Sequence, residues 1–594
     1  MLISTHNYSL NRLVFINYII FMKIFFSGFY PDFKTDNAGV RPSVFVDLFS
    51  KVYDEQCYIG ETIEDSDILC EFDMLMNGDH PYAIPSAINS KKWKHTYLFT
   101  GESYMKQNPD NYSCVLWGER NTKNIINIPL YIPYLYTNNF VDKIQSKNDV
   151  INIPKEDICV FISNPRGGIR NSFLNELDKH FKVTYAGRYK NNTGGPILSP
   201  YNTEEFRDFV KQYKFIVSME NSINDTYITE KITHGLLCDT IPIYWGTDMV
   251  VHHINKNRVL RLPQNCTTND INKIIKQIAF LKNNEKMWKH VVSQNNFPNK
   301  ENKLVRTLDD VAKDIKCLIS ETPWKHITNS FCICNPNFEK DRYNEMHNFF
   351  NKLQVPEHCT TYICPTYKHT ITDEIYNFHV KSQLVQRLRR EPLKKGELSL
   401  TLNYKSIFEN IVLNYKSGWF ITFESDILDG EYVNEFPAFL DNIKDKPWDA
   451  VHIGVVQGFE KLMFDTPVLN TNTGYRNSAT DHNQQLKKFV QDNTTPEKKY
   501  IEDFTDENDT YRMIRKFSSK TTDVILWKYD AIVKINNFMD NIETNYALPF
   551  DFYLTHFLEM NIDTKFYWTI KEFFKQSSFL NLSESNLGND KYAL

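Results

Sequence analysis

The stretch YKFIVSMENSINDTYITEKITHGLLCDTIPIYWGT, residues 213–247, decides the fold of this chain. An apolar run, KFIVSM, is typical of a strand that ends in Glu220 and Asn221, and a short polar loop follows. After the loop, EKITHGLLC is typical of a helix and TIPIYWG of a second buried strand. Short apolar strands that alternate with helices are typical of a parallel sheet covered on both faces. The stretch therefore predicts an α/β fold.

The start of the predicted helix, Thr229-Glu230-Lys231, follows the carboxyl end of a strand, where ligands of α/β folds usually bind. The free backbone N–H groups and partial positive charge of a helix N-terminus suit a diphosphate. We expect Lys231 to neutralise phosphate and Glu230 to accept hydrogen bonds from a ribose or hexose. The alternative is that Thr229 and Glu230 only cap and polarise the helix.

The same alternation of strands and helices extends along the chain. One set is expected from Met22 to about Tyr136, and a second from Ile158 to Gly246. Two such sets predict two Rossmann-like lobes with a cleft between them. Residues 300–320 have the pattern of a closing amphipathic helix. Pro323 then marks a boundary, because the residue before a proline is displaced from helical geometry, and a further α/β pattern follows.

Composition narrows the function classes. The chain has 594 residues, which predicts several lobes rather than one core. Its net charge of −5 at pH 7 argues against a general nucleic-acid-binding protein. Eleven cysteines, an odd number without regular spacing, predict reduced thiols rather than a disulfide framework.

Residues 1–21 are expected to be an N-terminal extension outside the folded lobes. The apolar run LVFINYIIFM (13–22) is shorter than the roughly 20 residues that a membrane helix needs. Neither the basic start nor the small-residue cleavage site of a signal peptide is evident. We expect MKIFFSGFY, from Met22, to contain the first buried strand, and the protein to be soluble or peripheral. An N-terminal membrane anchor is the alternative.

Residues 213–247 closely resemble the signature of the α1,3/α1,4-fucosyltransferase family. In that signature a strand ends in E-N-S or E-N-T, and Y-x-T-E-K and I-P-I-Y-W-G follow. FISNPRGGIRNSFLNEL (161–177) is similar to the family's S-N-P…R-N-x-F segment. YLFTGES (97–103) and IPLYIPY (128–134) are similar to its acceptor-side strand and the strand after it. The resemblance covers about residues 22–320.

The resemblance implies a GT-B fold, with an acceptor-side lobe at residues 22–150 and a GDP-fucose-binding lobe at 151–322. It places Arg170 against the diphosphate, where a guanidinium binds bidentately and stays charged. It implies that Glu102 is the general base that deprotonates the acceptor hydroxyl. The positions that match the family's nucleotide-sugar site are Asn221, Tyr227, Glu230 and Lys231.

The implied reaction is an inverting transfer of fucose from GDP-fucose to a hydroxyl of an oligosaccharide or glycoprotein. Arg170, Lys231 and a helix N-terminus would stabilise the charge on the departing GDP, so no metal cofactor is expected for this half. The alternative is that the first half uses another nucleotide sugar.

The second half carries a different pattern. In GWFITFESDI (418–427) a buried strand runs into Glu424 and Asp426. Two carboxylates at the end of a strand can ligate a divalent cation that also grips a nucleotide diphosphate. E-x-D alone is a weak motif, because exposed acidic loops are common.

The surroundings of E-S-D are similar to the lipopolysaccharide and collagen galactosyltransferase-like family, over about residues 328–594. The resemblance implies a GT-A-like domain that uses Mn²⁺ or Mg²⁺ and a UDP-sugar, with Glu424 and Asp426 as metal ligands and Asp551 as a further acid. The sequence departs from that family where Asn403-Tyr404 replace Ser-His, and Ser399-Leu400 replace Gly-Cys. The matching segments are CICNPNFEKDR (332–342), KKGELSLTLNYKSIFENI (394–411), WDAVHIG (448–454) and LPFDFYL (548–554).

Together the patterns predict a two-module glycosyltransferase that builds on a glycan. Two alternatives stay open beside it. In the first alternative, the second half is a non-catalytic module that docks acceptor glycans, as the altered Ser-His position suggests. In the second, the whole chain is an interaction protein without enzymatic activity.

Overall fold

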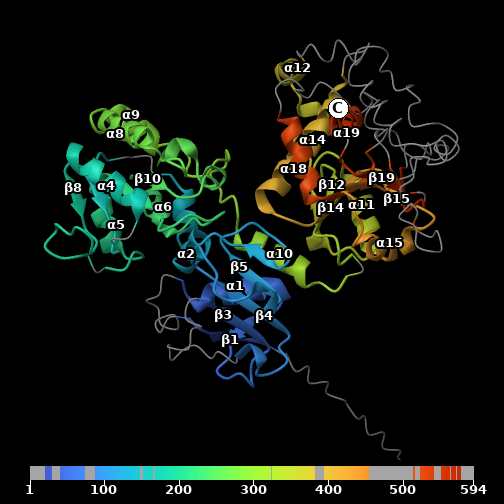
Figure 1. The fold of residues 1–594 in the computed structure, drawn as a ribbon, viewed down its shortest axis with the longest axis horizontal. Helices are drawn as coiled ribbons and strands as arrows, with labels where there is room; N and C mark the ends of the chain where they lie inside the picture. The colour runs from blue at the N-terminus through green and yellow to red at the C-terminus, as the bar shows by residue number, and fades with distance from the viewer. Residues whose placement is uncertain are drawn as a thin grey trace, which may run out of the picture.

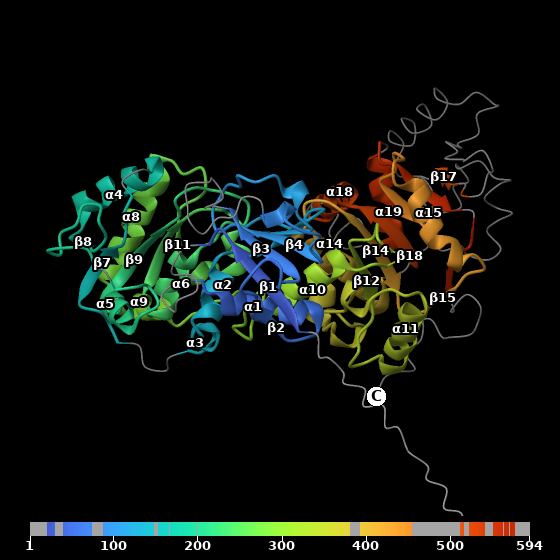
Figure 2. The ribbon, with the colours of Figure 1, turned by 90° about the horizontal axis from the view of Figure 1, so that it is seen from below.

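The computed structural model describes three α/β units, and the predicted α/β class with parallel sheets is confirmed. Figures 1 and 2 show the first lobe, in blue, between the second lobe and the C-terminal unit. The described residues are 21–29, 40–73, 87–147, 152–164, 167–197, 199–322, 324–380, 393–453, 511, 513–515, 522–540, 550–561, 563–569 and 571–576.

The first lobe is built on a six-stranded sheet in the order β2-β1-β3-β4-β5-β6, in which every pair is parallel. The first strand begins at Met22 and is buried, as the sequence predicts. The strands are β1 (Met22–Ser27), β2 (Cys57–Ile59), β3 (Ile68–Phe72), β4 (His95–Phe99), β5 (Cys114–Trp117) and β6 (Ile125–Asn127). The helices of this lobe are α1 (Pro42–Tyr53), α2 (Tyr131–Thr137) and α3 (Val141–Gln145).

Helix α2 corrects one prediction. The apolar run IPLYIPY reads as a strand, but its second half begins a helix at Tyr131 and the strand β6 ends before it, at Asn127. Pro133 is in the first turn of α2, where a backbone N–H would have no partner within the helix. Proline is therefore compatible with a helix at this place, and apolar composition alone does not distinguish a buried helix from a buried strand.

The second lobe repeats the architecture with a five-stranded parallel sheet, in the order β11-β10-β9-β7-β8. The alternation predicted from 158 to 246 is confirmed element by element. The elements are β7 (Glu156–Val160), α4 (Gly168–His180), β8 (Val183–Tyr185), α5 (Glu204–Val210), β9 (Tyr213–Met219), α6 (Glu230–Leu237), β10 (Ile241–Trp245), α7 (Val250–His253), β11 (Leu260–Arg261), α8 (Thr268–Lys282) and α9 (Glu285–Val292).

The predicted closing helix is α10 (Leu308–Ile319), which starts with a capping box between Thr307 and Asp310. Its buried face joins the core of the first lobe and packs against α1. Helix α10 follows the second lobe in sequence but packs on the first lobe in space (Figure 2).

The C-terminal unit has a seven-stranded mixed sheet in the order β13-β12-β14-β18-β16-β19-β17. Its first three strands are parallel, and β18 runs antiparallel to both neighbours. The strands are β12 (Asn329–Ile333), β13 (Thr360–Tyr362), β14 (Trp419–Glu424), β16 (Ala450–His452), β17 (Met513–Arg515), β18 (Val524–Lys528) and β19 (Phe566–Thr569), with β15 (Ile427–Asp429) and β20 (Phe574–Gln576) as a separate pair. The helices are α11 (Lys340–Lys352), α12 (Asp373–Val380), α14 (Lys395–Asn414), α15 (Phe436–Ile443), α18 (Tyr529–Met539) and α19 (Phe550–Met560).

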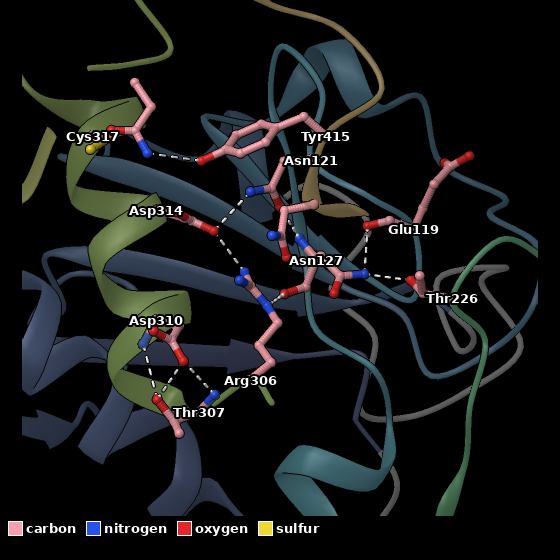
Figure 3. A network of polar contacts seen from close by, with 12 residues as sticks. Glu119, Asn121, Asn127, Thr226, Arg306, Thr307, Asp310, Asp314, Cys317 and Tyr415 are labelled. Carbon is pink, nitrogen blue, oxygen red and sulfur yellow. Dashed lines mark hydrogen bonds and ion pairs between the residues drawn. The ribbon is translucent and has the colours of Figure 1, made fainter. Parts of the chain in front are cut away.

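A polar network joins the two lobes through α10 (Figure 3). Asp314 of α10 accepts hydrogen bonds from Arg306 at 2.8 Å and from Asn121 at 2.7 Å. Arg306 Nε donates to the Asn127 carbonyl at 2.7 Å, and the Asn127 amide donates to Thr226 Oγ1. The network therefore runs from α10 through the first lobe to the loop that precedes α6.

The C-terminal unit joins the same place. Asn121 and Tyr415 form a parallel bridge, and the Lys416 N–H donates to the Asn121 carbonyl at 2.7 Å. Asp225, in the loop before α6, pairs with Arg120 at 3.0 Å and lies 3.5 Å from Lys416 Nζ. All three units thus contact one another around Asp225.

Within the described residues, no helix is both long and apolar enough to cross a membrane. The predicted alternative of an N-terminal anchor concerns residues 1–20, which lie outside the described part of the chain.

Candidate functional site

The candidate donor site is built where β9 ends and α6 begins. Thr229 is the N-cap of α6, and its side chain accepts from the Lys231 N–H at 3.4 Å. Glu220, one residue beyond β9, accepts from the backbone N–H and the hydroxyl of Thr229, each at 2.8 Å. The strand end and the helix start are therefore tied together by a buried carboxylate.

Glu220 also positions Lys231. The Lys231 ammonium lies 3.3 Å from Glu220, 3.0 Å from Thr229 Oγ1 and 3.8 Å from Glu230. Burial alone would lower the pKa of Lys231, but Glu220 and Glu230 together raise it above its usual value. Lys231 is therefore a fixed cation that keeps 29% of its side chain exposed.

Arg170 lines the same site from another helix, α4. It is in the first turn of α4 and only 3% exposed. Its guanidinium donates to Asn221 Oδ1 at 3.0 Å and to the Asn164 carbonyl at 2.8 Å. Burial lowers its pKa from a value so high that it stays charged at neutral pH. A Cβ atom on Gly167 would lie 3.0 Å from Arg170 Nε, so glycine leaves room for the guanidinium.

Arg170 and Lys231 line one cavity of about 260 Å³ in the second lobe. Asn221 and Glu230 line it as well, so the structure brings together four of the predicted donor-binding residues. A second cavity, of about 280 Å³, shares Tyr201 and Glu230 with it and is lined also by first-lobe residues. The remaining side chains of the first cavity are Phe161, Ile162, Ser163, Asn164, Tyr201, Ile216, Val217, Met219 and His234.

Tyr227 and Glu102 lie beside this cavity and are not among its lining residues. Tyr227 is 4% exposed, and its hydroxyl interacts electrostatically with Lys231. Glu102 is half-buried on the loop after β4, in the first lobe, and is close enough to Lys231 and Glu230 of the second lobe to interact with them electrostatically. Burial raises the pKa of the Glu102 carboxyl, and Lys231 partly offsets that rise.

One contact within the first lobe and one between the lobes position the loop that carries Glu102. The Trp117 indole donates to the Glu102 carbonyl at 2.8 Å, and Ser103 hydrogen-bonds to Ser222 of the second lobe. A Cβ atom on Gly118 would lie 3.3 Å from Tyr227 Cα, so the first lobe contacts the α6 loop closely.

His234 and Glu220 are residues of this site that sequence reasoning missed. His234 lines the cavity from the second turn of α6, one helical turn after Glu230. Burial lowers its pKa to about 4, so the imidazole is neutral at neutral pH. Its Nε2 atom is buried and has no hydrogen-bond partner among the described residues. The spacing of four residues from Glu230 is the signal that would have indicated it.

The second predicted site lies at the end of β14. Glu424 Oε2 and Asp426 Oδ1 both accept from the Gln576 amide at 3.2 Å, so the structure brings the two carboxylates together. Glu424 Oε1 also accepts from Thr522 at 2.6 Å. Burial raises the pKa of Glu424 to about 8, and the charge of Asp426 adds to the effect. Both line a small cavity of about 70 Å³ together with Arg342.

Asp551 is near enough to Glu424 to raise its pKa further, but it is not among the residues that line the cavity. Among the described residues, three His, Cys, Asp or Glu ligand atoms within 4.8 Å of one another occur elsewhere, at Cys317, His358 and Cys359. The carboxylates of Glu424, Asp426 and Asp551 therefore do not all lie within 4.8 Å of one another.

Asn403 and Tyr404, which depart from the galactosyltransferase-like pattern, have structural contacts. The Asn403 amide donates to the Thr366 carbonyl at 3.0 Å and holds the loop that borders the cavity. Tyr404 stacks on Phe550 with 3.8 Å between ring centroids and donates to the Thr522 carbonyl at 2.6 Å. Tyr404 therefore joins α14 to the segments that carry Thr522 and Asp551.

Residues 153–292, the lobe that holds Arg170 and Lys231, match the family described as glycosyltransferase family 10 (fucosyltransferase), C-terminal part. The predicted resemblance to fucosyltransferases is confirmed for this segment. The match ends before the C-terminal unit, so the galactosyltransferase-like assignment of residues 328–594 remains a prediction.

Relatives of known name agree with that class. A putative fucosyltransferase, R654, of Acanthamoeba polyphaga mimivirus is 26% identical over 234 residues, 36% of this chain and 38% of the relative. The α-(1,3)-fucosyltransferase FucT of Helicobacter pylori is 37% identical over 109 residues, 18% of this chain and 22% of that protein. The GDP-fucose protein O-fucosyltransferase 3 of Gallus gallus is 31% identical over 93 residues, 15% of this chain and 20% of that protein. The chain thus spans less than two-fifths of the length of each.

Solved structures include an α1,3-fucosyltransferase with GDP-fucose, at 18% identity and a TM-score of 0.38. The comparison covers 51% of this chain and 91% of that one.

Proposed function

We propose that residues 22–322 transfer fucose from GDP-fucose to a glycan hydroxyl, as an inverting α1,3-fucosyltransferase of GT-B type. The observation that carries the proposal is that two cations, Arg170 and Lys231, line one cavity. Both lie within the segment that matches glycosyltransferase family 10. The names of the relatives support a fucose donor. The lobe of residues 151–322 is proposed to bind the donor, and the lobe of 22–150 the acceptor.

In the proposed reaction Glu102 accepts the proton of the acceptor hydroxyl as that oxygen forms a bond to C1 of fucose. The bond from C1 to the β-phosphate oxygen breaks, and its electron pair leaves with GDP. Because the acceptor attacks opposite the phosphate, the anomeric configuration inverts. The cavity that extends from Glu230 to first-lobe residues supports an acceptor that approaches from the first lobe.

The charge that develops on GDP is proposed to be stabilised by protein cations alone. Arg170 and Lys231 are held by Asn221 and Glu220 before the donor arrives, so little reorganisation accompanies the reaction. The N–H groups at the start of α6 add a partial positive charge. We expect no metal cofactor for this half.

A panel of nucleotide sugars, assayed by release of GDP or UDP with a glycan acceptor, tests the donor. GDP-fucose is expected to be the preferred donor, with kcat lowered about 10²- to 10³-fold in Arg170→Lys. Preference for a different GDP- or UDP-sugar would change the proposed donor but leave the protein a glycosyltransferase. Absence of turnover with every donor, on acceptors of both oligosaccharide and glycoprotein type, would contradict an enzymatic role.

For residues 328–594 we propose a GT-A-like domain that uses a UDP-sugar and Mn²⁺ or Mg²⁺. The adjacent carboxylates of Glu424 and Asp426 at the end of a parallel strand favour this function. The structural contacts of Asn403 favour the alternative, a non-catalytic module that docks the acceptor glycan. Metal-dependent hydrolysis of UDP-sugar by the wild type but not by Glu424→Ala would decide for catalysis.

A further inference from the structure

Three metal-ligating side chains meet where the two halves of the chain join. Cys317 is in the last turns of α10, and His358 and Cys359 are in the short helix η6 (Glu357–Cys359) of the C-terminal unit. One ligand atom from each lies within 4.8 Å of the others. Neither half could form this group without the other.

The contacts between α10 and η6 hold the group in register. Cys317 Sγ lies 3.0 Å from the His358 carbonyl. One turn earlier on α10, Lys313 donates to Thr361 Oγ1 at 2.9 Å, just after η6. The two sulfur atoms also lie within 4.8 Å of each other. Side chains from both elements are therefore already close before any ligand binds.

A hydrogen bond to Ser320 determines which ring nitrogen of His358 is available to bind a metal ion. The Ser320 hydroxyl donates to the Lys316 carbonyl at 2.5 Å, so its oxygen accepts from His358 Nε2, which is 2.9 Å away. The proton is therefore on Nε2, and Nδ1 carries the free lone pair. Histidines that bind metals usually donate their other ring N–H in this way.

We propose that Cys317, His358 and Cys359 bind a Zn²⁺ ion that fastens the two halves together. Two thiolates and one imidazole are ligands that Zn²⁺ prefers, and they fill three of its four tetrahedral positions. Binding releases one proton from each thiol, and the two thiolates balance the charge of the ion. Cys317 also lines a cavity of about 810 Å³ between the halves, from which a water molecule would supply the fourth ligand.

A disulfide between Cys317 and Cys359 is the competing use of the pair. It would require an oxidant, and it would leave the arrangement of His358 and Ser320 without a role. The two uses differ in metal content and in the mass of the linked peptides, so one set of measurements separates them.

The test measures zinc in the purified full-length chain, after reduction and removal of loosely bound metal. We expect about one Zn²⁺ per wild-type chain. Cys317→Ser and His358→Gln should each lose it, while Cys266→Ser, a partly exposed cysteine of the second lobe, should keep it. Replacement by Co²⁺ should give sulfur-to-metal charge-transfer absorption, which the carboxylates of Glu424 and Asp426 cannot produce.

A second readout is the thermal unfolding midpoint, measured with and without chelator. Chelation should lower the thermal unfolding midpoint of the wild type to that of Cys317→Ser and leave the variant unchanged. The proposal is overturned if the wild type binds no more zinc than Cys317→Ser, or if unreduced protein contains a Cys317–Cys359 disulfide and no metal.

Discussion

The donor cavity of the second lobe and the acidic site of the C-terminal unit differ in the sign of the charge that the protein supplies. In the donor cavity, buried Glu220 serves to hold the Lys231 cation, and Arg170 faces the same space. In the acidic site, Glu424 and Asp426 share one amide donor and repel each other. A nucleotide diphosphate can bind the cations of the donor cavity directly, whereas in the acidic site a metal cation must lie between it and the carboxylates. The two sites are thus proposed to neutralise the charge of a nucleotide diphosphate in two different ways.

The largest expected effect concerns the proposed base. Glu102→Gln should lower kcat about 10²- to 10⁴-fold, because the amide cannot accept the acceptor's proton. Initial rates of fucose transfer measure the change, and Glu61→Gln, an exposed first-lobe carboxyl, is the matched control. Unchanged kcat would remove Glu102 from the mechanism.

The same carboxyl predicts a pH dependence. Burial raises the pKa of Glu102, and only its ionised form accepts a proton, so activity should fall as the pH drops through that raised pKa. The acidic limb of kcat/KM should therefore lie above the pH at which an ordinary carboxyl titrates. It should disappear from the residual activity of Glu102→Gln, and a limb that persists in the variant would belong to another group.

Arg170→Lys tests the cationic side of the comparison. Lysine keeps the charge but loses the paired donors, so kcat should fall about 10²- to 10³-fold. Lys211→Ala, whose ammonium is exposed and pairs with Asp208, should leave activity unchanged. Equal rates for Arg170→Lys and the wild type would mean that the departing diphosphate does not meet this guanidinium.

The acidic side is tested by Glu424→Ala, with Mn²⁺ and UDP-sugars. The variant should lose metal-dependent UDP-sugar hydrolysis and retain fucose transfer, because the two sites lie in separate units. Loss of both activities would instead indicate that the units depend on each other through the contacts at Asp225.

His234→Phe should have the smallest effect. Phenylalanine keeps the aromatic contacts with Tyr134 and Tyr201 but removes the unpaired Nε2 atom. One lost hydrogen bond to the donor predicts an increase in KM of about fivefold, near 1 kcal/mol. Steady-state kinetics with varied GDP-fucose measure it, and an unchanged KM would show that His234 does not contact the donor.

The sequence predicted the parallel α/β lobes because strand and helix periodicities alternate cleanly from 156 to 245. Arg170, Asn221, Glu230 and Lys231 line one cavity, and they were predicted because their segments resemble the fucosyltransferase signature. For Glu230 and Lys231 the start of a helix after a strand gave an independent reason. Sequence reasoning missed α2, since a buried helix and a buried strand have the same apolar composition, and Pro133 is allowed in a first turn.

Other features depend on contacts between distant segments. Glu220 reads as the last residue of a strand, and only the fold shows that its carboxylate holds Thr229 and Lys231. The junction of Asn121, Asp225 and Lys416 joins three units, and the group of Cys317, His358 and Cys359 joins two. Sequence spacing carries no signal for such contacts, because their residues have no shared periodicity.

The central claim is that a cation pair of the protein, with no ion, stabilises the departing nucleotide. Its most direct test is the rate of fucose transfer from GDP-fucose in excess EDTA, for the wild type and for Cys317→Ser, which controls for metal at the junction. Neither rate is expected to change when EDTA is added. Loss of transfer in both proteins, restored by Mn²⁺ or Mg²⁺, would contradict it.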